Sequence, residues 1–436
     1  MPTHDCPPVP VPPSGGACRR RALRRAAACA LTTTVIAALS YAPAIAVGGG
    51  PRAVADLLAS GIVTDGTNRA NQVGPRADGT VMVVTPGTDD GTLDERIRRT
   101  VGQRKTLIVA YPESLWPFVG GKSSPVPPLA ATYDVSRSVA VHRNLAVMRR
   151  LAGTDTTVIY TGYSQGADAL GNATEKAIAQ GVDLSDARIV LVADTRSPWG
   201  IKAAADGIPG VPAVLRPFGI TPDGARDPGR SAGADVTSTI IVGDPASNFQ
   251  WRPDRPVESI LVNGAGFLTI HTGWGAQTYG DLDALGTPSE LRSVAGSTRY
   301  RVYDARHPLA LLRQMVYSRT GMRYTTDDLT RWDAEGERFF ATEAPSADNS
   351  AVPVTRVNAP VRSGPDKSQA STTGPGHTSG PGHTSGPGDG PAAKTTPRAA
   401  KVRGPRSVDP AAQFVRSITL TVEDLVREGR SRRAGR

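Results

Sequence analysis

Ser164 stands at the centre of the stretch GYSQG, with one glycine two residues before it and another two residues after it. A serine hydroxyl is inert until a base takes its proton, and many enzymes hold such a serine on a tight turn between a strand and a helix. The apolar run TVIYT precedes the motif, and a helix-like stretch begins at Gln165. Since Gly162 and Gly166 suit a tight turn, we predict that Ser164 is a nucleophile rather than part of an ordinary turn.

The base for such a serine is usually a histidine, and the sequence has 6 histidines to choose from. His271 follows an apolar run and opens the glycine-rich stretch HTGWGAQTYGD, which could reach a site. His307 is followed by proline and a new helix, so capping or packing explains it, and His142 sits within a predicted helix before the serine. The other three lie in the two ends of the chain, so we favour His271.

A carboxylate should orient the base, and it should end a strand between the serine and the histidine. Asp244 directly follows the apolar run TSTIIVG, which places it at the same sheet edge as the nucleophile. Asp194 also ends a strand-like run, RIVLVAD, and is the main rival. Asp235 and Asp254 are weaker candidates. We therefore predict Asp244 and keep Asp194 open.

The negative oxygen that forms when a serine attacks a carbonyl needs hydrogen-bond donors. The backbone N–H of Gln165, the residue after the nucleophile, is one expected donor. Thr88 could supply a second through its N–H and its hydroxyl, because it lies in the loop VVTPGTDDG after an early strand. A plain Pro-Gly turn is the alternative for that loop.

The elements that must position these residues show as short β-branched runs that alternate with helix-like stretches. Strand-like runs of this kind, buried on both faces, predict an α/β fold with a mainly parallel sheet and helices on both faces. The predicted strands are 79–87, 105–112, 156–164, 187–194 and 236–245.

One long stretch, 196–234, interrupts this alternation and is rich in glycine and proline. Between two strand ends such a segment would form a lid or a pocket wall, although an ordinary long loop fits as well. Trp199 and Phe218 in this stretch, with Tyr163 beside the serine, are candidate residues of a substrate pocket. The apolar side chains of the stretch could equally pack as a small secondary core.

The two ends of the chain have the composition of an export signal and a low-complexity tail. Residues 1–46 combine an arginine cluster with an apolar run and a small-residue cleavage pattern, and all 3 cysteines lie there. Segment 47–77 is a polar lead-in with a helical patch, and 78–344 is the predicted domain. We predict a disordered linker over 345–409 and a helix with a basic end over 410–436. An uncleaved membrane anchor is the alternative for the first segment.

The formal net charge of +10 belongs to these two ends, because segment 47–345 carries 31 basic and 32 acidic residues. A nucleic-acid-binding fold is therefore not expected. The predicted mature chain has no cysteine, and no metal or cofactor is expected at the site. We expect an exported protein, secreted or associated with the cell envelope, whose basic end could contact an anionic surface.

Several stretches together give the chain a resemblance to a known group. GYSQGA is typical of cutinase-like serine hydrolases, and TPGT, VAYPESLWPFVGG, VGDPASNFQW and IHTGWGAQTYGDLD resemble the related PE-PPE domain of actinobacterial exported proteins. This resemblance covers roughly residues 78–320. It implies an α/β-hydrolase fold, the triad Ser164, Asp244 and His271, and the oxyanion positions Thr88 and Gln165. The chain departs from cutinases by lacking disulfides, and it lacks the helical module that precedes the PE-PPE domain.

Three functions follow from these features as hypotheses. The first is a secreted esterase or lipase that hydrolyses acyl esters of lipid type through an acyl-enzyme. The second is an acyltransferase that passes the acyl group to a cell-envelope glycolipid. The third is a cell-envelope binding protein without catalytic activity, which the order of Ser164, Asp244 and His271 disfavours.

Overall fold

The computed structural model describes residues 49–67, 76–91, 93, 103–122, 124, 126–209 and 211–357. The chain divides into two compact units after Arg362, and all described residues belong to the first unit. The predicted export signal, the predicted terminal helix and most of the predicted linker therefore lie outside the described residues.

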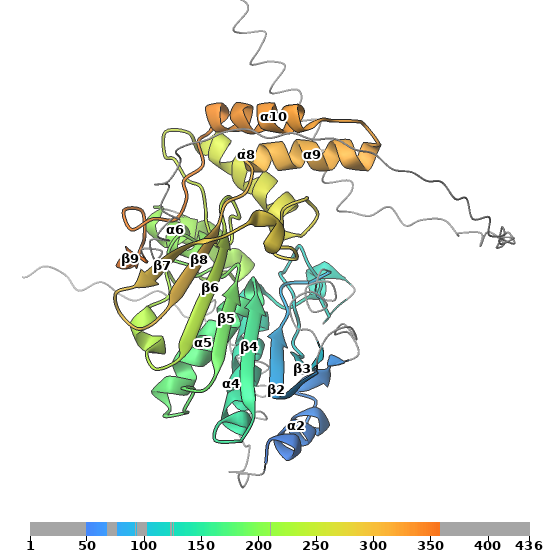
Figure 1. Cartoon of the computed structure of the whole chain (residues 1–436), viewed down its shortest axis with the longest axis vertical. Coiled ribbons are helices and arrows are strands. Elements are labelled where there is room, and N and C mark those ends of the chain that lie inside the picture. Colours follow the sequence, from blue (N-terminus) through green and yellow to red (C-terminus); the bar gives the residue numbers. More distant parts are fainter. Residues whose placement is uncertain are drawn as a thin grey trace, which may run out of the picture. The chain divides into compact units, whose positions relative to one another are not determined.

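A nine-stranded sheet runs through the described part of the chain in the order β1-β3-β2-β4-β5-β6-β8-β7-β9 (Figure 1). The six strands from β3 to β8 in this order are parallel, and β1, β7 and β9 join antiparallel at the two sides. The strands are β1 (Val63–Asp65), β2 (Arg76–Thr85), β3 (Gln103–Val109), β4 (Thr157–Tyr163), β5 (Arg188–Val192), β6 (Asp235–Ile241), β7 (Ser289–Ser293), β8 (Arg299–Tyr303) and β9 (Val354–Arg356).

The five predicted strands correspond to β2 through β6, and they form the centre of the sheet. Ser164 lies between the central strand β4 and the helix that follows it. A mainly parallel sheet with helices on both faces and a serine at this turn is the predicted α/β-hydrolase fold, which is confirmed.

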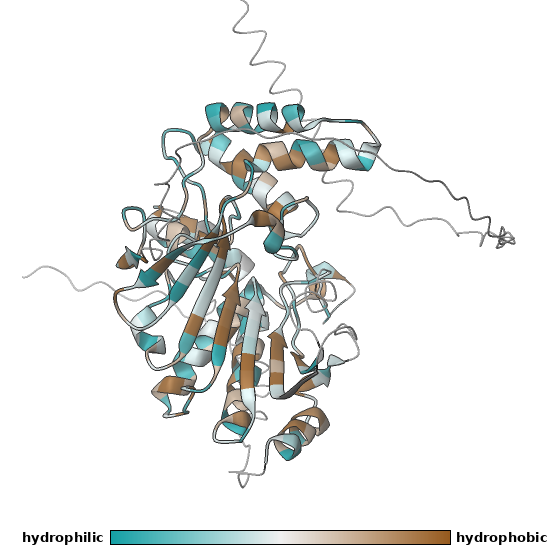
Figure 2. Ribbon diagram, viewed as in Figure 1, coloured by the Kyte–Doolittle hydropathy of each residue, from teal (hydrophilic) through white to brown (hydrophobic). Residues whose placement is uncertain are grey.

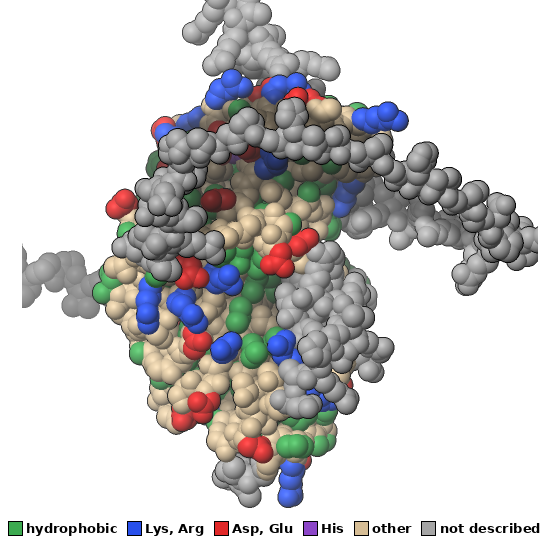
Figure 3. All heavy atoms as spheres, viewed as in Figure 1, with side chains coloured by type: hydrophobic (Ala, Val, Ile, Leu, Met, Phe, Trp, Pro, Cys, Tyr) green, Lys and Arg blue, Asp and Glu red, His purple; other side chains and the backbone are tan. Residues whose placement is uncertain are grey.

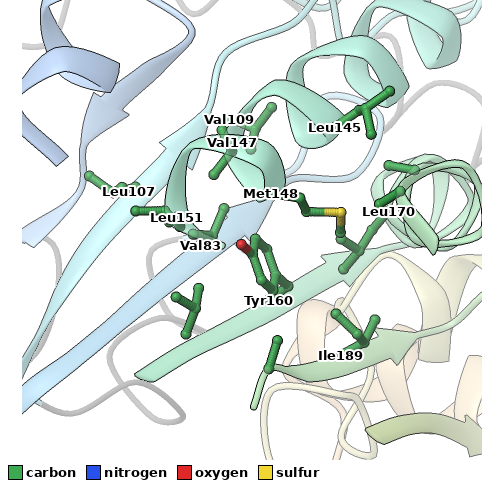
Figure 4. Close-up of a cluster of buried hydrophobic side chains, with 14 of the residues drawn as sticks. Val83, Leu107, Val109, Leu145, Val147, Met148, Leu151, Tyr160, Leu170 and Ile189 are labelled. Atoms are coloured by element: carbon green, nitrogen blue, oxygen red, sulfur yellow. The ribbon is translucent and has the colours of Figure 1, made fainter. Parts of the chain in front are cut away.

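Three helices cover one face of the sheet: α2 (Gly50–Ala59), α4 (Tyr133–Leu151) and α5 (Gln165–Ala179). Alternate residues of the strands point toward them, because successive side chains of a strand face opposite sides. Figure 4 shows this cluster, in which Val83, Leu107 and Tyr160 of the strands meet Met148 and Leu170 of the helices. Burial of these side chains fixes the register of β4, and with it the height at which Ser164 leaves the sheet.

The next helices lie at the carboxyl ends of the strands and on the opposite face. They are α8 (Pro256–Gly266), the π-helical turn η5 (Phe267–His271), α9 (Pro308–Thr320) and α10 (Thr326–Phe339). Leu311 of α9 and Ile270 of η5 pack with Ile241 and Tyr303 from the sheet. In Figure 2 the strands carry long brown stretches and α10 is mostly teal, in keeping with its largely polar sequence. Within the described residues no helix is both long and apolar enough to cross a membrane.

Two predicted boundaries are wrong. The lead-in 47–77 is part of the domain, because Val54 and Leu57 of α2 are buried in the main core and β1 pairs with β3. The predicted disordered linker begins too early, since β9 pairs with β7 and Val354 is buried. The composition around β9 is polar and contains proline, so the sequence pattern did not predict a strand there. This short edge strand is stabilised by pairing with its neighbour β7.

Candidate active site

Ser164 occupies a strained turn between β4 and α5. Its backbone has φ 53° and ψ −119°, a combination that residues other than glycine rarely adopt. The flanking glycines explain how the turn fits. A Cβ on Gly162 would stand 2.6 Å from the carbonyl oxygen of Gly166, and a Cβ on Gly166 would collide with the Pro86 carbonyl. The turn therefore requires glycine at both positions, as the motif predicted.

The serine lies at one end of a chain of three polar side chains. His271 Nε2 is 2.9 Å from Ser164 Oγ, and His271 Nδ1 is 3.0 Å from Asp244 Oδ1. An ionised carboxylate only accepts hydrogen bonds, so Nδ1 carries the proton and Nε2 accepts the serine hydroxyl. His271 lies 107 positions from Ser164 and 27 positions from Asp244 in the sequence. The fold brings the three together in the arrangement that removes a proton from a serine.

Asp244 is fully buried, and its carboxylate accepts four hydrogen bonds. Besides His271, the Ala246 N–H donates to Oδ1 at 3.1 Å. The hydroxyls of Tyr279 and Ser247 donate to Oδ2 at 2.6 Å and 3.0 Å. Burial would raise the pKa of Asp244, but its electrostatic interaction and hydrogen bond with His271, with the donors from Tyr279 and Ala246, lower it below its usual value. The carboxylate is therefore held charged and in one orientation.

The ring of His271 lies between two aromatic rings. Tyr163 stacks on one side with ring centroids 5.3 Å apart, and Phe267 stacks with centroids 5.0 Å apart. The Tyr163 hydroxyl also donates to the His271 carbonyl. Because Tyr163 is buried with its ring against His271, it positions the histidine, and its predicted role as a pocket residue stays a prediction. A π-helical turn brings Phe267 and His271 together, and such turns are frequent at functional sites.

Gln165 contributes to the site through its backbone. It is the first residue of α5, so its N–H has no partner within the helix and lies next to the serine. Its buried side chain is already engaged: Nε2 donates to the carbonyls of Ser114 and Tyr133, and Oε1 accepts from Ser136. Gln165 therefore offers a backbone donor and also attaches segment 114–136 to the turn.

The loop that carries Thr88 lies directly against the serine. A Cβ placed on Gly87 would be 3.4 Å from Ser164 Cβ and 2.9 Å from the Tyr163 ring. The Asp90 carboxylate accepts from the Gly87 N–H at 3.2 Å, and the Asp89 N–H donates to the Glu113 carbonyl at 3.0 Å. The structure thus places Gly87 beside the nucleophile, with half-buried Thr88 next to it in the chain, and the donor role of Thr88 stays a prediction.

The rival histidines have other roles. His307 is buried at the N-terminus of α9, where Nδ1 accepts from the Leu309 N–H at 3.2 Å and Nε2 donates to the Phe340 carbonyl at 2.9 Å. These bonds require the neutral ring, and burial lowers the pKa of His307. His142 is exposed on α4, with Nδ1 2.7 Å from the Ser138 carbonyl oxygen. Capping explains His307, as the sequence suggested.

The rival carboxylates are likewise engaged elsewhere. Asp194 receives the Arg226 guanidinium at 3.0 Å in a buried ion pair. Asp235 pairs with Arg299 at the surface, and Asp254 is exposed. Asp244 is therefore the candidate that the structure places at His271.

Ion pairs anchor the glycine- and proline-rich segment 196–234. Its short helices are α6 (Ile201–Gly207) and α7 (Val211–Leu215), with 3-10 turns η3 (Arg216–Phe218) and η4 (Pro228–Ser231). Lys202 Nζ lies 2.8 Å from Asp168 on α5, and Arg226 lies 2.8 Å from Glu175 on the same helix. All four are buried, so a swinging lid would have to break charge pairs inside the protein.

Trp199 does not line a substrate pocket. Its ring is 6% exposed and packs against Tyr300 with centroids 5.3 Å apart, and its N–H donates to the Ser346 carbonyl at 3.1 Å. The predicted pocket role is therefore wrong, because a large aromatic residue in a long loop was here a core residue. The side chain of Phe218, the remaining pocket candidate, lies outside the described residues.

In the described part of the chain, no group of three or more His, Cys, Asp or Glu side chains could hold a metal ion. A cavity of about 220 Å³ lies between α4, α5 and segment 196–234, and charged side chains line it. Neither Ser164 nor His271 borders this cavity. The cavity is therefore separate from the candidate catalytic residues.

Comparisons with known proteins show only a distant structural similarity. No family model matches the chain, and no curated protein matches it. Among solved structures it is similar to an esterase/lipase from an uncultured bacterium, with 11% identity, 62% of this chain and 78% of that chain covered, and a TM-score of 0.26. The RedJ thioesterase of prodiginine biosynthesis from Streptomyces coelicolor matches with 14% identity, 61% and 90% coverage and a TM-score of 0.28. A Pyrobaculum calidifontis esterase has 11% identity, 61% and 79% coverage and a TM-score of 0.27. Similarity at this level does not bear on substrate or mechanism.

Proposed function

We propose that this chain is a serine hydrolase that cleaves acyl esters through an acyl-enzyme. The observation that carries the proposal is the pair of contacts at His271, 2.9 Å to Ser164 Oγ and 3.0 Å to Asp244 Oδ1. A neutral imidazole that accepts from a serine and donates to a buried carboxylate is a general base aimed at a nucleophile.

The steps follow from these contacts. His271 Nε2 takes the hydroxyl proton as Ser164 Oγ bonds to the ester carbonyl carbon, and the carbonyl oxygen becomes negative. The N–H of Gln165, with the donors of Thr88, would stabilise that oxygen. The C–O bond to the alcohol then breaks, and the alcohol leaves with the proton from His271. Water repeats the sequence on the acyl-enzyme, releasing the acid and restoring Ser164.

The environment of the histidine suits this cycle. When His271 takes the proton it becomes a cation, and the charged Asp244 beside it stabilises that cation. Tyr163 and Phe267 cover the two faces of the ring, which limits its rotation between attack and protonation of the alcohol. A base that stays aligned through both proton transfers lowers the barrier without moving the backbone.

We further propose that the chain is an exported hydrolase related to the PE-PPE domain group and that its substrates are lipid-type acyl esters. The quoted motifs support this proposal, since GYSQGA, TPGT and IHTGWGAQTYGDLD contain Ser164, Thr88 and His271. Transfer of the acyl group to an alcohol other than water would use the same residues, so product analysis with and without a glycolipid acceptor separates hydrolysis from transfer.

Turnover of a chromogenic acetyl ester tests the proposed hydrolase activity. Wild type should cleave the ester, and Ser164→Ala and His271→Ala should each lower kcat/KM by about 10⁴ or more, because the nucleophile and base act as one unit. His142→Ala is the matched control, since this exposed histidine lies outside the site, and it should retain wild-type turnover. Equal turnover by wild type and Ser164→Ala would refute the assignment.

A further inference from the structure

The cavity between α4, α5 and segment 196–234 has more cations than carboxylates in its wall. Its volume is about 220 Å³. The wall contains four cations and two carboxylates, namely Arg137, Lys176, Arg196 and Arg230 with Asp134 and Glu175. Segment 47–345 as a whole is nearly neutral, with 31 basic and 32 acidic residues, and blue and red side chains lie intermingled on the face drawn in Figure 3. The excess of positive charge is therefore a local property of this cavity.

Arg196 is a buried cation of this wall whose side-chain hydrogen bonds go to neutral oxygens. The residue is 9% exposed. One terminal nitrogen of its guanidinium donates to Asn172 Oδ1 at 2.7 Å, and the other donates to the Ala225 carbonyl at 3.2 Å. Nε donates to the Gly224 carbonyl at 3.2 Å. Because a guanidinium has five N–H groups, one further N–H remains on each terminal nitrogen beyond these three bonds.

The carboxylates near Arg196 are bonded more closely by other cations. The nearest carboxylate oxygens that the described part of the chain offers to its guanidinium lie 3.8 Å away on Glu175 and 3.9 Å away on Asp223. Glu175 accepts instead from Arg226 at 2.8 Å, and Asp223 accepts from Lys202 at 2.8 Å. A buried charge is normally paired within hydrogen-bond distance. An anion in the cavity that Arg196 borders would supply that pairing.

Two further cations of the wall are accessible from solvent. The Arg230 side chain is 58% exposed, and one of its terminal nitrogens lies 3.2 Å from Glu175. Lys176 is exposed on α5 and makes no ion pair with another described residue. With Arg137 of α4 and Arg196 after β5, these cations come from four parts of the chain. A ligand that enters the cavity therefore meets donors from several elements.

We propose that this cavity binds a phosphate group, either as the free ion or at the end of a small phosphomonoester. A phosphoryl group carries a charge of about −1.5 to −2 at pH 7 and has three strong acceptor oxygens, which suits a wall with this excess of cations. The planar fork of arginine holds two phosphate oxygens at once, and Arg196 has one N–H left on each terminal nitrogen for such a contact. Binding here is independent of the proposed hydrolase activity, because neither Ser164 nor His271 borders the cavity.

Calorimetric titration of the full chain with inorganic phosphate at low ionic strength tests this proposal. Wild type should bind one phosphate per chain. Arg196→Lys keeps the charge but removes the fork, and Arg230→Gln removes an exposed cation of the wall; each should weaken binding at least about tenfold, the value of one hydrogen bond to a charged group. Arg299→Gln is the matched control, because this arginine is 49% exposed and pairs with Asp235 at the surface, and it should bind as wild type does. Thermal unfolding without phosphate checks the fold of each variant.

Further arms identify the source of the phosphate and the location of the site. Glycerol 3-phosphate that binds more tightly than inorganic phosphate would indicate a phosphomonoester, and weaker or equal binding would indicate the free ion. Ser164→Ala should bind phosphate as wild type does, whether or not the chain cleaves esters. Absence of binding to wild type would overturn the proposal. So would binding that is unchanged in both Arg196→Lys and Arg230→Gln, since the phosphate would then be held elsewhere, such as at the basic ends of the chain.

Discussion

Substitution of Tyr279 by phenylalanine removes one hydroxyl that donates to Asp244, the carboxylate that orients the proposed base. That hydroxyl donates to Asp244 Oδ2 at 2.6 Å and accepts from the Ile241 N–H at 3.1 Å. Tyr279 is 3% exposed, so it acts on the substrate only through Asp244 and His271. We expect the variant to lose turnover rather than substrate binding.

The size of the effect can be worked from the contacts. A hydrogen bond to a charged acceptor contributes about 1.5–3 kcal/mol. Ser247 still donates to the same oxygen at 3.0 Å in the variant, so the lower value applies, which corresponds to a loss of roughly tenfold in kcat. The Ile241 N–H also loses its acceptor, and leaving a buried donor unsatisfied lowers the free energy of unfolding by about 1–3 kcal/mol.

Steady-state kinetics on an acetyl ester measures both parameters. The expected result for Tyr279→Phe is a kcat about tenfold lower with KM little changed, and Tyr160→Phe serves as the control because Tyr160 is buried in the main core. A double-mutant cycle with His271→Ala gives the sharper test. If Tyr279 acts through the histidine, its substitution should have no further effect in the His271→Ala background. An equal proportional loss in both backgrounds would refute the reasoning.

Three further predictions concern buried ionisable side chains. Burial raises the pKa of Glu113 to about 7 despite its ion pair with Lys122, so the folded chain holds a proton that the unfolded chain releases above pH 4.5. The free energy of unfolding should then fall by about 3 kcal/mol as pH rises from 4.5 to 7, and urea unfolding of Glu113→Gln should lack this decline. His307 behaves oppositely, because its lowered pKa keeps it neutral when folded; stability should fall as pH drops below 6.5, and His307→Ala should show no such fall over the same titration. Lys202→Met removes one of the cations around buried Asp168, which keeps Arg137 at 3.1 Å, and this loss of a charged hydrogen bond should lower the unfolding free energy by about 1.5–3 kcal/mol in denaturant titration. A change under about 1 kcal/mol would show that the pair does not anchor segment 196–234.

The sequence allowed prediction of the central strands and of the three polar residues for a physical reason. Strands β2 to β6 lie in the centre of the sheet with at least one face buried, so their apolar runs are visible without tertiary information. Histidines are scarce, and only His271 and His307 follow Ser164 within the predicted domain, so elimination was effective. The structure places His271 at Ser164 and makes His307 a helix cap.

The edge strands and the supporting residues could not be predicted in this way. Strands β7 and β8 contain alternating charged residues and depend on pairing with neighbours distant in sequence. Tyr279 lies 35 residues from Asp244, and its contact depends on how the loop after His271 folds. The contact between Phe267 and His271 could have been predicted from the sequence, because residues four positions apart in a helical stretch lie on the same side of the helix. Trp199 was misjudged because a residue type alone does not separate a pocket wall from a core.

The most direct test of the central claim is covalent labelling of the full chain with a fluorophosphonate, followed by mass mapping of the modified peptide. Ser164, with its hydroxyl 2.9 Å from His271 Nε2, should carry the label, and labelling should be lost in Ser164→Ala and strongly slowed in His271→Ala. Absence of labelling in the folded wild type, or a label on a different serine that persists in Ser164→Ala, would contradict the proposal that Ser164 is the nucleophile.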